Sequence, residues 1–355
     1  MIGLIFCGDL KYCPYINRYT ERLDIMKVEY KIYYWNRSGF EYEDCSRHEA
    51  YNTSSNLNSG KIGKAIDFIR YRKWLVSKLN KDRPEKLIIL STLTGILLGK
   101  YLTANNCNYI FDIRDYSYEH IKLFSSIEKK IIDNSNFTAI SSSGFKAFLP
   151  EHEYVIAHNF NKKEIDIDYS FSKKSLPLDF VWNGVVRYFD YQVLYLDKLK
   201  NDSRFRIVFH GDGPELQKYI DYCMENKYEN IIFTGSYKNE DKASILTNAA
   251  ILNNAYGYVE NAGNKLKYAV SNRFYDGMIY HIPQIVEPVG FKSEWAENSK
   301  IGKPMTPSET FADDLFEYYN SINDEEFDNA CNEVLQSVVK EDEKYISAID
   351  AFINE

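Results

Sequence analysis

Short apolar runs rich in β-forming residues alternate with segments of helical period along the whole chain. This alternation is typical of βα units, in which helices join parallel strands. In the first half the predicted strands are Ile2–Cys7, Tyr30–Trp35, Lys86–Leu90, Tyr109–Asp112, Phe137–Ile140 and Tyr154–Ala157. In the second half they are Phe180–Asn183, Phe205–His210, Asn230–Thr234, Ala250–Asn254 and Gln284–Glu287. The pattern therefore predicts an α/β protein with two doubly wound domains.

A polar stretch without helical or strand period, Asn161–Leu178, separates the two sets of strands. We therefore predict a Rossmann-like N-terminal domain of residues 1–164, a linker of residues 165–178 and a Rossmann-like C-terminal domain of residues 179–355. From Pro307 onward the sequence predicts acidic amphipathic helices, which could pack back on the first domain. Residues Glu41–Gly60 are rich in Asn, Ser, Glu and Gly and predict a long polar loop.

Length and composition agree with two folded domains. Of the 355 residues, 45% are hydrophobic and 26% are charged, which excludes a disordered chain and a disulfide miniprotein. The formal charge of −8 argues against a general nucleic-acid binder. Residues 1–164 carry 24 Lys and Arg against 19 Asp and Glu, or +5, whereas residues 165–355 carry 19 against 32, or −13. The first domain is therefore the one suited to an anionic partner.

Features of a membrane-spanning or secreted protein are not found in the sequence. The N-terminal apolar run is short and has no basic region before it, so it predicts a strand and not a signal peptide. The apolar stretch Leu87–Gly99 is shorter than the roughly 20 residues that a bilayer span needs. The six cysteines form no Cys-x-x-Cys pair. We expect a cytoplasmic protein with reduced cysteines.

Glycines follow three of the predicted strands in the second half. Gly184 is followed by Arg187, Gly211 and Gly213 precede Pro214, and Gly235 ends a further strand. A helix start with free amides beside a guanidinium suits a diphosphate. A tight βα turn is the alternative explanation of a lone Gly-x-Gly. Later in the chain, the spacing of Asn272, Arg273 and Asp276 predicts that they share one face of a helical turn.

These segments, in this order, resemble the nucleotide-binding domain of the retaining GT-B glycosyltransferases that build bacterial capsular and O-antigen polysaccharides. Asn272–Val286 is similar to the family pattern Asn-Lys-Leu-x-Glu-Tyr-x-x-x-Gly-x-Pro-Val, with Arg273, Asp276 and His281 in place of its Lys, Glu and Gly. The resemblance implies the GT-B fold, in which two Rossmann-like domains face a central cleft. It also implies transfer of a sugar from a nucleoside-diphosphate sugar to a saccharide or lipid-linked saccharide acceptor in cell-surface polysaccharide synthesis.

The resemblance assigns roles to residues of the second domain. Asp276 would accept hydrogen bonds from the ribose hydroxyls, because a carboxylate can receive both donors of a diol. Arg187 would bind the diphosphate and, as the main catalytic residue, stabilise the charge of the leaving group. The expected donor-binding residues are Gly184, Arg187, Gly211, Gly213, Gly235, Tyr256, Lys265, Asn272, Arg273 and Asp276.

The N-terminal half resembles the same enzymes more loosely, over Pro14–Leu23 and Tyr33–Arg37. At the end of a predicted strand, Asp112-Ile-Arg114-Asp115 matches a place where the family often has an Arg-Asp or His-Asp pair that lines the cleft. The resemblance makes Arg114 and Asp115 further catalytic candidates and puts Asp9, Asp112 and Arg114 on the acceptor side. An Arg–Asp salt bridge that caps the next helix is the alternative.

The sequence departs from the family pattern at the donor site. Many relatives carry an acidic residue eight positions before the residue matched by Asp276, where this chain has Tyr268. The usual lysine after the phosphate arginine is also missing, so that Lys265, Lys267 or Arg273 would supply the second cation. Such enzymes generally need no divalent metal, and we expect no metal and no cofactor. The only Asp-x-Asp, Asp166-Ile-Asp168, lies in the predicted linker and is interpreted as a solvated acidic pair.

A basic helix is predicted over Lys61–Lys81, with one acidic residue and several apolar ones. Helices of this composition can lie on anionic membranes, which would place the protein at the inner face of the plasma membrane. An ordinary surface helix is the alternative.

For the whole protein, two other functions stay open: a nucleotide-sugar 2-epimerase of the GT-B fold, and a non-catalytic partner subunit that binds a nucleotide sugar.

Overall fold

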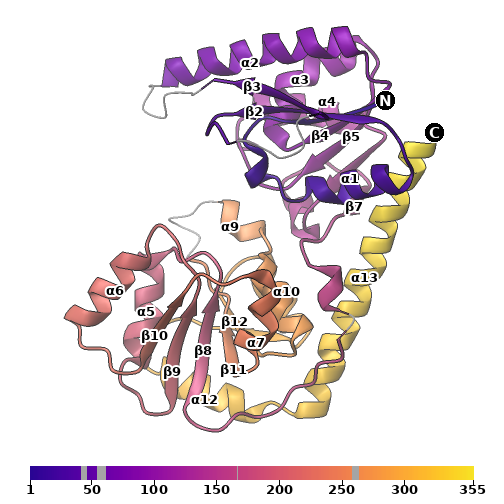
Figure 1. The fold of residues 1–355 in the computed structure, drawn as a ribbon. Coiled ribbons are helices and arrows are strands. Elements are labelled where there is room, and N and C mark those ends of the chain that lie inside the picture. The colour runs from indigo at the N-terminus through magenta and orange to yellow at the C-terminus, as the bar shows by residue number, and fades with distance from the viewer. Residues whose placement is uncertain (41–45, 54–60, 166, 258–263) are drawn as a thin grey trace. The chain divides into compact units, whose positions relative to one another are not determined.

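The computed structural model describes residues 1–40, 46–53, 61–165, 167–257 and 264–355. The chain divides into two compact units, Met1–His158 together with Lys340–Glu355, and Asn159–Val339. In each unit, helices flank a single parallel sheet (Figure 1). The long helix α13 (Asp324–Asn354) contributes its first part to the second unit and its last part to the first.

The first unit contains a seven-stranded parallel sheet in the order β3-β2-β1-β4-β5-β6-β7. Its strands are β1 (Ile2–Phe6), β2 (Tyr30–Asn36), β3 (His48–Asn52), β4 (Lys86–Leu90), β5 (Asn108–Ile113), β6 (Phe137–Ile140) and β7 (Tyr154–Ile156). Its helices are η1 (Leu10–Tyr12), α1 (Ile16–Ile25), α2 (Lys61–Asp82), α3 (Thr92–Ala104), α4 (Lys122–Asp133) and η2 (Ser143–Ala147).

Helices cover both faces of this first sheet, so its central strands are apolar throughout. On one face Leu4, Ile88 and Ile110 pack against α1 and the last part of α13. Figure 1 shows α2, α3 and α4 on the other face. Covering by helices on both sides explains why the β1 and β4 segments read as continuous apolar runs in the sequence.

Strand β3 corrects the prediction of one polar loop over Glu41–Gly60. Residues His48–Asn52 pair in parallel with β2, in register from Ile32 with His48 to Asn36 with Asn52. The segment lacks the alternation of a half-buried strand, and the free edge of β2 supplies the pairing that its own composition does not predict. Aromatic contacts of Tyr51 with Trp35 and Trp74 hold it there. The rest of the predicted loop, 41–45 and 54–60, lies outside the described residues.

The second unit contains a six-stranded parallel sheet in the order β10-β9-β8-β11-β12-β13. Its strands are β8 (Leu178–Asn183), β9 (Phe205–His210), β10 (Ile231–Gly235), β11 (Ala249–Asn253), β12 (Gln284–Val286) and β13 (Gly302–Pro304). Its helices, besides the first part of α13, are η3 (Lys162–Glu164), α5 (Phe189–Leu199), α6 (Leu216–Glu225), η4 (Asn239–Asp241), α7 (Lys242–Leu246), α9 (Asn264–Tyr268), α10 (Asn272–Ile279), α11 (Phe291–Asn298) and α12 (Phe311–Ser321).

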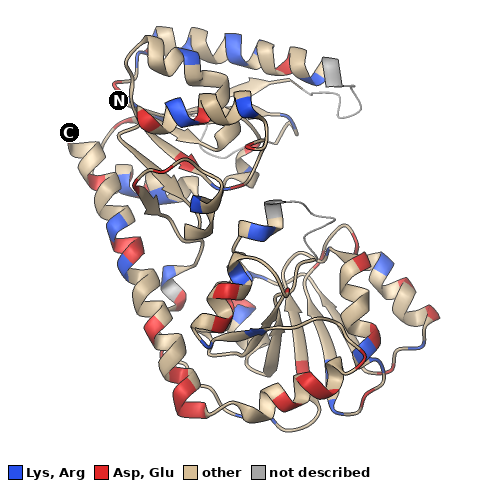
Figure 2. Cartoon of the chain, turned by 180° about the vertical axis from the view of Figure 1, so that it is seen from behind, with Lys and Arg blue, Asp and Glu red and all other residues tan. Residues whose placement is uncertain are grey.

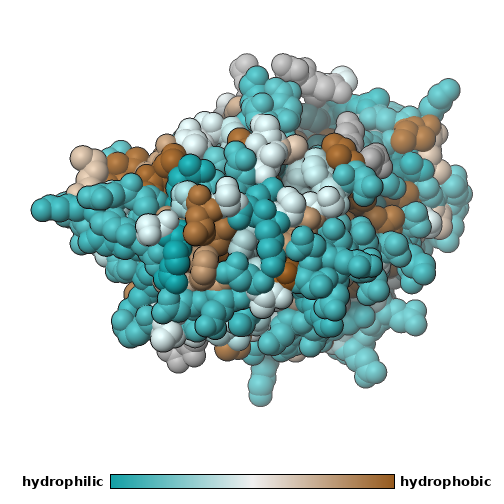
Figure 3. Space-filling model, turned by 90° about the horizontal axis from the view of Figure 1, so that it is seen from below, coloured by the Kyte–Doolittle hydropathy of each residue, from teal (hydrophilic) through white to brown (hydrophobic). Residues whose placement is uncertain are grey.

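All eleven strands predicted from the hydrophobic pattern are present, with ends that differ by at most two residues. The short edge strand β13 was not predicted, because Gly302–Pro304 has neither apolar residues nor alternation. The core of the second unit gathers large aromatic residues such as Trp182, Phe209 and Tyr275. On the face seen in Figure 3, hydrophilic side chains cover most of the surface and hydrophobic ones form separate patches.

Charged side chains are unevenly distributed over the elements. Figure 2 shows Lys and Arg along α2, and Asp and Glu gathered on α12 and the start of α13. Of the helices within the described part of the chain, none combines the length and the apolar character that crossing a bilayer requires.

Candidate functional site

Four of the predicted glycines meet at the carboxyl ends of β8, β9 and β10. The amide of Gly184 donates to the His210 carbonyl at 2.8 Å, and that of Gly211 donates to the Gly235 carbonyl at 2.8 Å. A Cβ on Gly211 would lie 1.9 Å from the Gly184 carbonyl oxygen, and one on Gly213 would lie 2.3 Å from the Val186 oxygen. Only glycine permits this approach of two backbones, and the amides of Gly184 and Gly211 hold the crossing loops together.

Arg187 lies beside these glycines and lines a pocket of about 680 Å³. Its side chain is exposed, with the guanidinium carbon 4.8 Å from the centre of the Tyr188 ring. The walls of the pocket are mostly apolar and aromatic, and include Tyr188, Glu215, Tyr256, Leu266 and Thr306. The pocket therefore offers an exposed cation next to aromatic surface, at the edge where open α/β sheets bind ligands.

Asp276 is almost fully buried, with 4% of its surface exposed, on α10. Its Oδ2 accepts a hydrogen bond from the Asn183 side-chain amide at 2.8 Å, and its Oδ1 accepts one from Lys242 Nζ at 2.8 Å. Lys242 Nζ also lies 2.8 Å from Glu164 Oε2. One ammonium group thus bridges two carboxylates at the carboxyl end of β8.

These charges shift one another's pKa values. Burial raises the pKa of Asp276, although Lys242 and Asn183 oppose the rise. Burial alone would lower the pKa of Lys242, but the neighbouring Asp276 and Glu164 carboxylates raise it above its ordinary value. Lys242 is thus protonated at neutral pH, whereas the charge of Asp276 depends on this lysine.

Asn272 and Arg273, which were predicted to share one face of a helical turn with Asp276, differ in burial. Asn272 is exposed at the start of α10, whereas Arg273 is buried and stacks on Trp182, with its guanidinium carbon 3.4 Å from the ring centre. Its Nε donates to Asn254 Oδ1 at 3.1 Å. The two residues differ in exposure because the Arg273 guanidinium is held inward by Asn254 and Trp182.

Tyr256 lines the pocket and also contacts the buried guanidinium of Arg273. Its ring lies 4.7 Å from the Arg273 guanidinium carbon and 4.0 Å from Lys292 Nζ. Burial alone would raise the pKa of Tyr256, yet the two cations bring it below its ordinary value. Lys292 is itself neutralised by Glu287 at 3.0 Å. Lys292 and Glu287 therefore balance each other's charge below the pocket.

His281 stands where the family pattern has glycine, and its backbone explains that pattern. It has a φ of +51°, in the left-handed region that favours glycine. A contact of 2.5 Å between His281 Nδ1 and Asp328 Oδ1 holds the residue in this conformation. The position therefore requires a particular backbone and not a particular side chain.

Other predicted residues of this unit are less fully described. Lys265 lies in α9, but its side chain is outside the described part of the structure. Lys267 Nζ lies 5.5 Å from the centre of the Tyr268 ring, the residue that replaces the usual acid. Asp166, the first residue of the Asp-x-Asp, is outside the described residues.

In the first unit, Asp112 and Arg114 form a buried ion pair. Asp112 is completely buried and Arg114 exposes 9% of its side chain. The guanidinium donates to both carboxylate oxygens at 2.6 and 2.9 Å, and to the Ala157 carbonyl at 2.7 Å. Tyr19 donates to Asp112 at 2.7 Å, and Tyr345 of α13 lies 3.3 Å from Arg114 Nη2.

This arrangement corrects the picture of Asp112 and Arg114 as residues that line a cleft. Their bonds go to α1, to the segment after β7 and to α13, and they leave Asp112 no exposed surface. The contacts are those of a structural ion pair that fastens the C-terminal helix. It does not cap the following helix, as the alternative prediction had it, because α4 begins only at Lys122.

Asp9 and Asp115 differ from this pair. Asp9 is buried, and its Oδ1 accepts hydrogen bonds from the amides of Arg37 and Ser38 at 2.8 and 3.0 Å. It therefore fixes the turn after β2 against the loop after β1. Asp115 is exposed beyond the end of β5, where a ligand could reach it.

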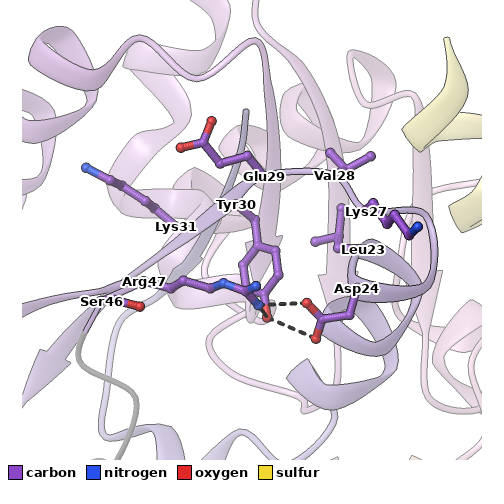
Figure 4. A pocket seen from close by; sticks show the side chains of 9 residues that line it. All are labelled: Leu23, Asp24, Lys27, Val28, Glu29, Tyr30, Lys31, Ser46 and Arg47. Atoms are coloured by element: carbon purple, nitrogen blue, oxygen red, sulfur yellow. Dashed lines mark hydrogen bonds and ion pairs between the residues drawn. The ribbon is translucent and has the colours of Figure 1, made fainter.

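A second pocket, of about 540 Å³, opens at the amino ends of β2 and β3 in the first unit. Figure 4 shows Arg47 lying between Asp24 and Tyr30. Its Nη1 donates to Asp24 Oδ1 at 2.6 Å and to the Tyr30 hydroxyl at 2.7 Å. Two of the charges that line this pocket, Asp24 and Arg47, are thus engaged with each other. The pocket lies at the amino ends of the strands, whereas the predicted residues of this unit lie at the carboxyl ends.

Sequence reasoning missed three residues that the structure places around Asp276, namely Asn183, Lys242 and Glu164. Asn183 is the last residue of β8, just before Gly184, so the sequence could have predicted its place beside the glycine loop. Lys242 and Glu164 lie in polar segments without any motif, one at the start of α7 and the other in η3. Only the tertiary fold brings these two segments together.

Comparison with known proteins identifies the fold. No protein-family model matches the sequence, and no curated protein matches it. Among solved structures, Anabaena Alr3699/HepE in complex with UDP has a TM-score of 0.68 at 12% identity and covers 99% of both chains. A glycosyltransferase from Rickettsia africae ESF-5 has a TM-score of 0.67 at 12% identity, covering 99% of this chain and 98% of its own.

A putative UDP-N-acetylglucosamine 2-epimerase from Listeria monocytogenes also matches, with a TM-score of 0.55 at 8% identity over 93% of this chain and 90% of its own. At these identities the likeness establishes the fold alone. The two parallel-sheet, Rossmann-like units have the GT-B fold, as the resemblance implied.

Proposed function

We propose that the protein is a glycosyltransferase. It moves a sugar from a nucleoside-diphosphate sugar to a saccharide or lipid-linked saccharide acceptor in cell-surface polysaccharide synthesis, with retention of configuration. The observation that carries the proposal is the crossing of Gly184, Gly211 and Gly235 beside the exposed Arg187 in the second unit. The Anabaena protein of the same fold is in complex with UDP, which supports the binding of a nucleotide.

In the proposed reaction the residues of this edge act mainly on the leaving group. Departure of a nucleoside diphosphate builds negative charge, which the Arg187 guanidinium would stabilise. Asp276 would accept hydrogen bonds from the ribose hydroxyls. The chain supplies the Arg187 cation itself, so we propose a reaction without a metal or cofactor. Asp115 is the exposed candidate for orienting hydroxyl groups on the acceptor side.

A panel of nucleoside diphosphates and their sugars tests the proposal. A ligand that binds only the native state raises the apparent melting temperature, so one nucleotide should stand out. With that donor and a saccharide acceptor, release of the nucleoside diphosphate together with a glycosylated product is expected. Formation of an isomeric nucleotide sugar would instead show an epimerase, and binding without turnover would show a partner subunit.

Arg187→Ala is expected to reduce turnover by roughly 10²–10³-fold, because one preorganised donor to a developing anion is worth about that much. Asp276→Ala is expected chiefly to weaken nucleotide binding. Steady-state kinetics and titration calorimetry separate the two effects. The matched control is Lys198→Ala on α5, which removes an ammonium paired with the exposed Glu309. It should change neither turnover nor nucleotide binding. Unchanged kinetics in both site variants would refute the donor site.

We further propose that α2 brings a cytoplasmic enzyme to the inner face of the membrane. Ile66 and Ile69 are 44% and 55% exposed on this helix, among the exposed cations Lys64, Arg70 and Lys73. Apolar side chains set among cations suit an anionic lipid surface.

The protein should therefore float with phosphatidylglycerol vesicles at low salt, and Arg70→Glu with Lys73→Glu should abolish flotation. Flotation of the charge-reversed variant at the wild-type level, or no flotation of the wild type, would exclude α2 as the contact.

A further inference from the structure

The bridge between Asp276, Lys242 and Glu164 gives Lys242 a role beyond the family pattern. Lys242 Nζ lies 2.8 Å from one oxygen of each carboxylate, and 12% of its side chain is exposed. The Asn183 amide binds the other oxygen of Asp276. Because a carboxylate has about four lone-pair sites, two protein donors leave two sites for the hydroxyls of a diol.

We propose that Lys242 is a positioning residue for nucleotide binding, which holds the Asp276 carboxylate ionised and oriented, and that Glu164 limits this effect by sharing the same ammonium. The inference rests on the proposed function. It assigns to Lys242 no contact with the nucleotide; the residue acts through Asp276.

Burial would otherwise neutralise the carboxylate. Burial raises the pKa of Asp276, Lys242 and Asn183 lower it, and the charge of Glu164 raises it again. In a protonated Asp276 one carboxyl oxygen would carry a hydrogen. That oxygen would present a donor to the ribose hydroxyls, and the side chain would have fewer sites that accept hydrogen bonds. Nucleotide binding should therefore weaken as pH falls through the pKa of Asp276, and that pKa should move in opposite directions when Lys242 or Glu164 loses its charge.

Other groups face the same site and must be considered in a pH experiment. Tyr237, after β10, and Tyr280, after α10, both interact with the charges of this cluster. Burial raises the pKa of each of these tyrosines, so both stay neutral over the acidic range. Lys242 stays protonated there as well. Over the acidic range Asp276, whose pKa is raised by burial, is thus the group of this cluster that the experiment follows.

The experiment measures the dissociation constant of the nucleoside diphosphate that binds best among UDP, GDP, CDP and ADP, by calorimetry between pH 5 and 8. For Lys242→Met we expect binding to be about tenfold weaker at pH 7, and its loss to begin about one pH unit higher than in the wild type. For Glu164→Gln we expect the loss to begin at lower pH. Lys238→Met removes a nearby ammonium that is 79% exposed, and serves as the control with the wild-type profile.

Opposite shifts in the two variants support the role of Lys242, because a merely structural defect would weaken binding in both without moving the profile in opposite directions. If Lys242→Met does not fold, Lys242→Gln and the Glu164→Gln shift decide the matter. Wild-type profiles in folded variants of Lys242 and Glu164 would overturn this inference and leave the proposed function standing. Wild-type protein that binds none of the four nucleotides would overturn both.

Discussion

Asp112→Asn is expected to lower the free energy of unfolding of the first unit by about 3–5 kcal/mol. The change keeps the shape of the side chain but removes the charge that faces Arg114, whose side chain is 9% exposed. Removing one partner of a buried ion pair leaves the other charge uncompensated in a medium of low dielectric. The Tyr19 hydroxyl also loses the carboxylate that it donates to. Urea denaturation followed by fluorescence measures the loss.

Two further variants show whether the loss comes from the unpaired charge. Glu151→Gln changes an exposed carboxylate of the same unit and should alter stability by less than about 0.5 kcal/mol. Asp112→Leu combined with Arg114→Met removes both charges and should recover part of the stability that Asp112→Asn loses. An Asp112→Asn protein of wild-type stability but without activity would instead support the acceptor-side role that the resemblance gave to Asp112 and Arg114.

The buried pair is one of several links between α13 and the first unit. Arg18 pairs with Asp342, Arg22 with Asp350 at 2.6 Å, and His158 with Glu341 at 2.6 Å. The sequence predicted acidic helices at its end and an excess of positive charge in its first half. It could not predict which charges meet, because each pair joins positions more than 180 residues apart.

The strands could be predicted where burial on both faces makes a run wholly apolar, as in β4 and β9. Strand β3 could not, since its polar segment forms a strand only because β2 offers a free edge. At the candidate site the same division holds. Gly184, Gly211 and Gly235 follow strands directly, so their meeting at one edge follows from parallel topology. The partners of Asp276 were hidden, because Lys242 reaches it from a different element of the fold.

Gly211→Ala is expected to destabilise the second unit by more than about 3 kcal/mol and to abolish nucleotide binding. The new Cβ would lie 1.9 Å from the Gly184 carbonyl oxygen and 2.8 Å from its carbon, so one of two backbones must move. The φ of +143° adds strain, since residues with a side chain rarely adopt it. The clashing atoms belong to the backbone, which cannot turn away as a flexible side chain could. Overpacking of such rigid groups costs several kcal/mol in addition to this strain.

Gly235→Ala separates strain from collision. Gly235 also has a positive φ, +77°, but a Cβ there would meet nothing within 4 Å. Gly235→Ala should lower the free energy of unfolding only by the cost of the positive φ, about 1–2 kcal/mol, and should leave nucleotide binding measurable. Chemical denaturation and calorimetry on the two variants give the comparison. Equal losses would mean that conformation alone requires these glycines, whereas a much larger loss at Gly211 shows that the close crossing of the β8 and β9 loops is what the nucleotide site is built on.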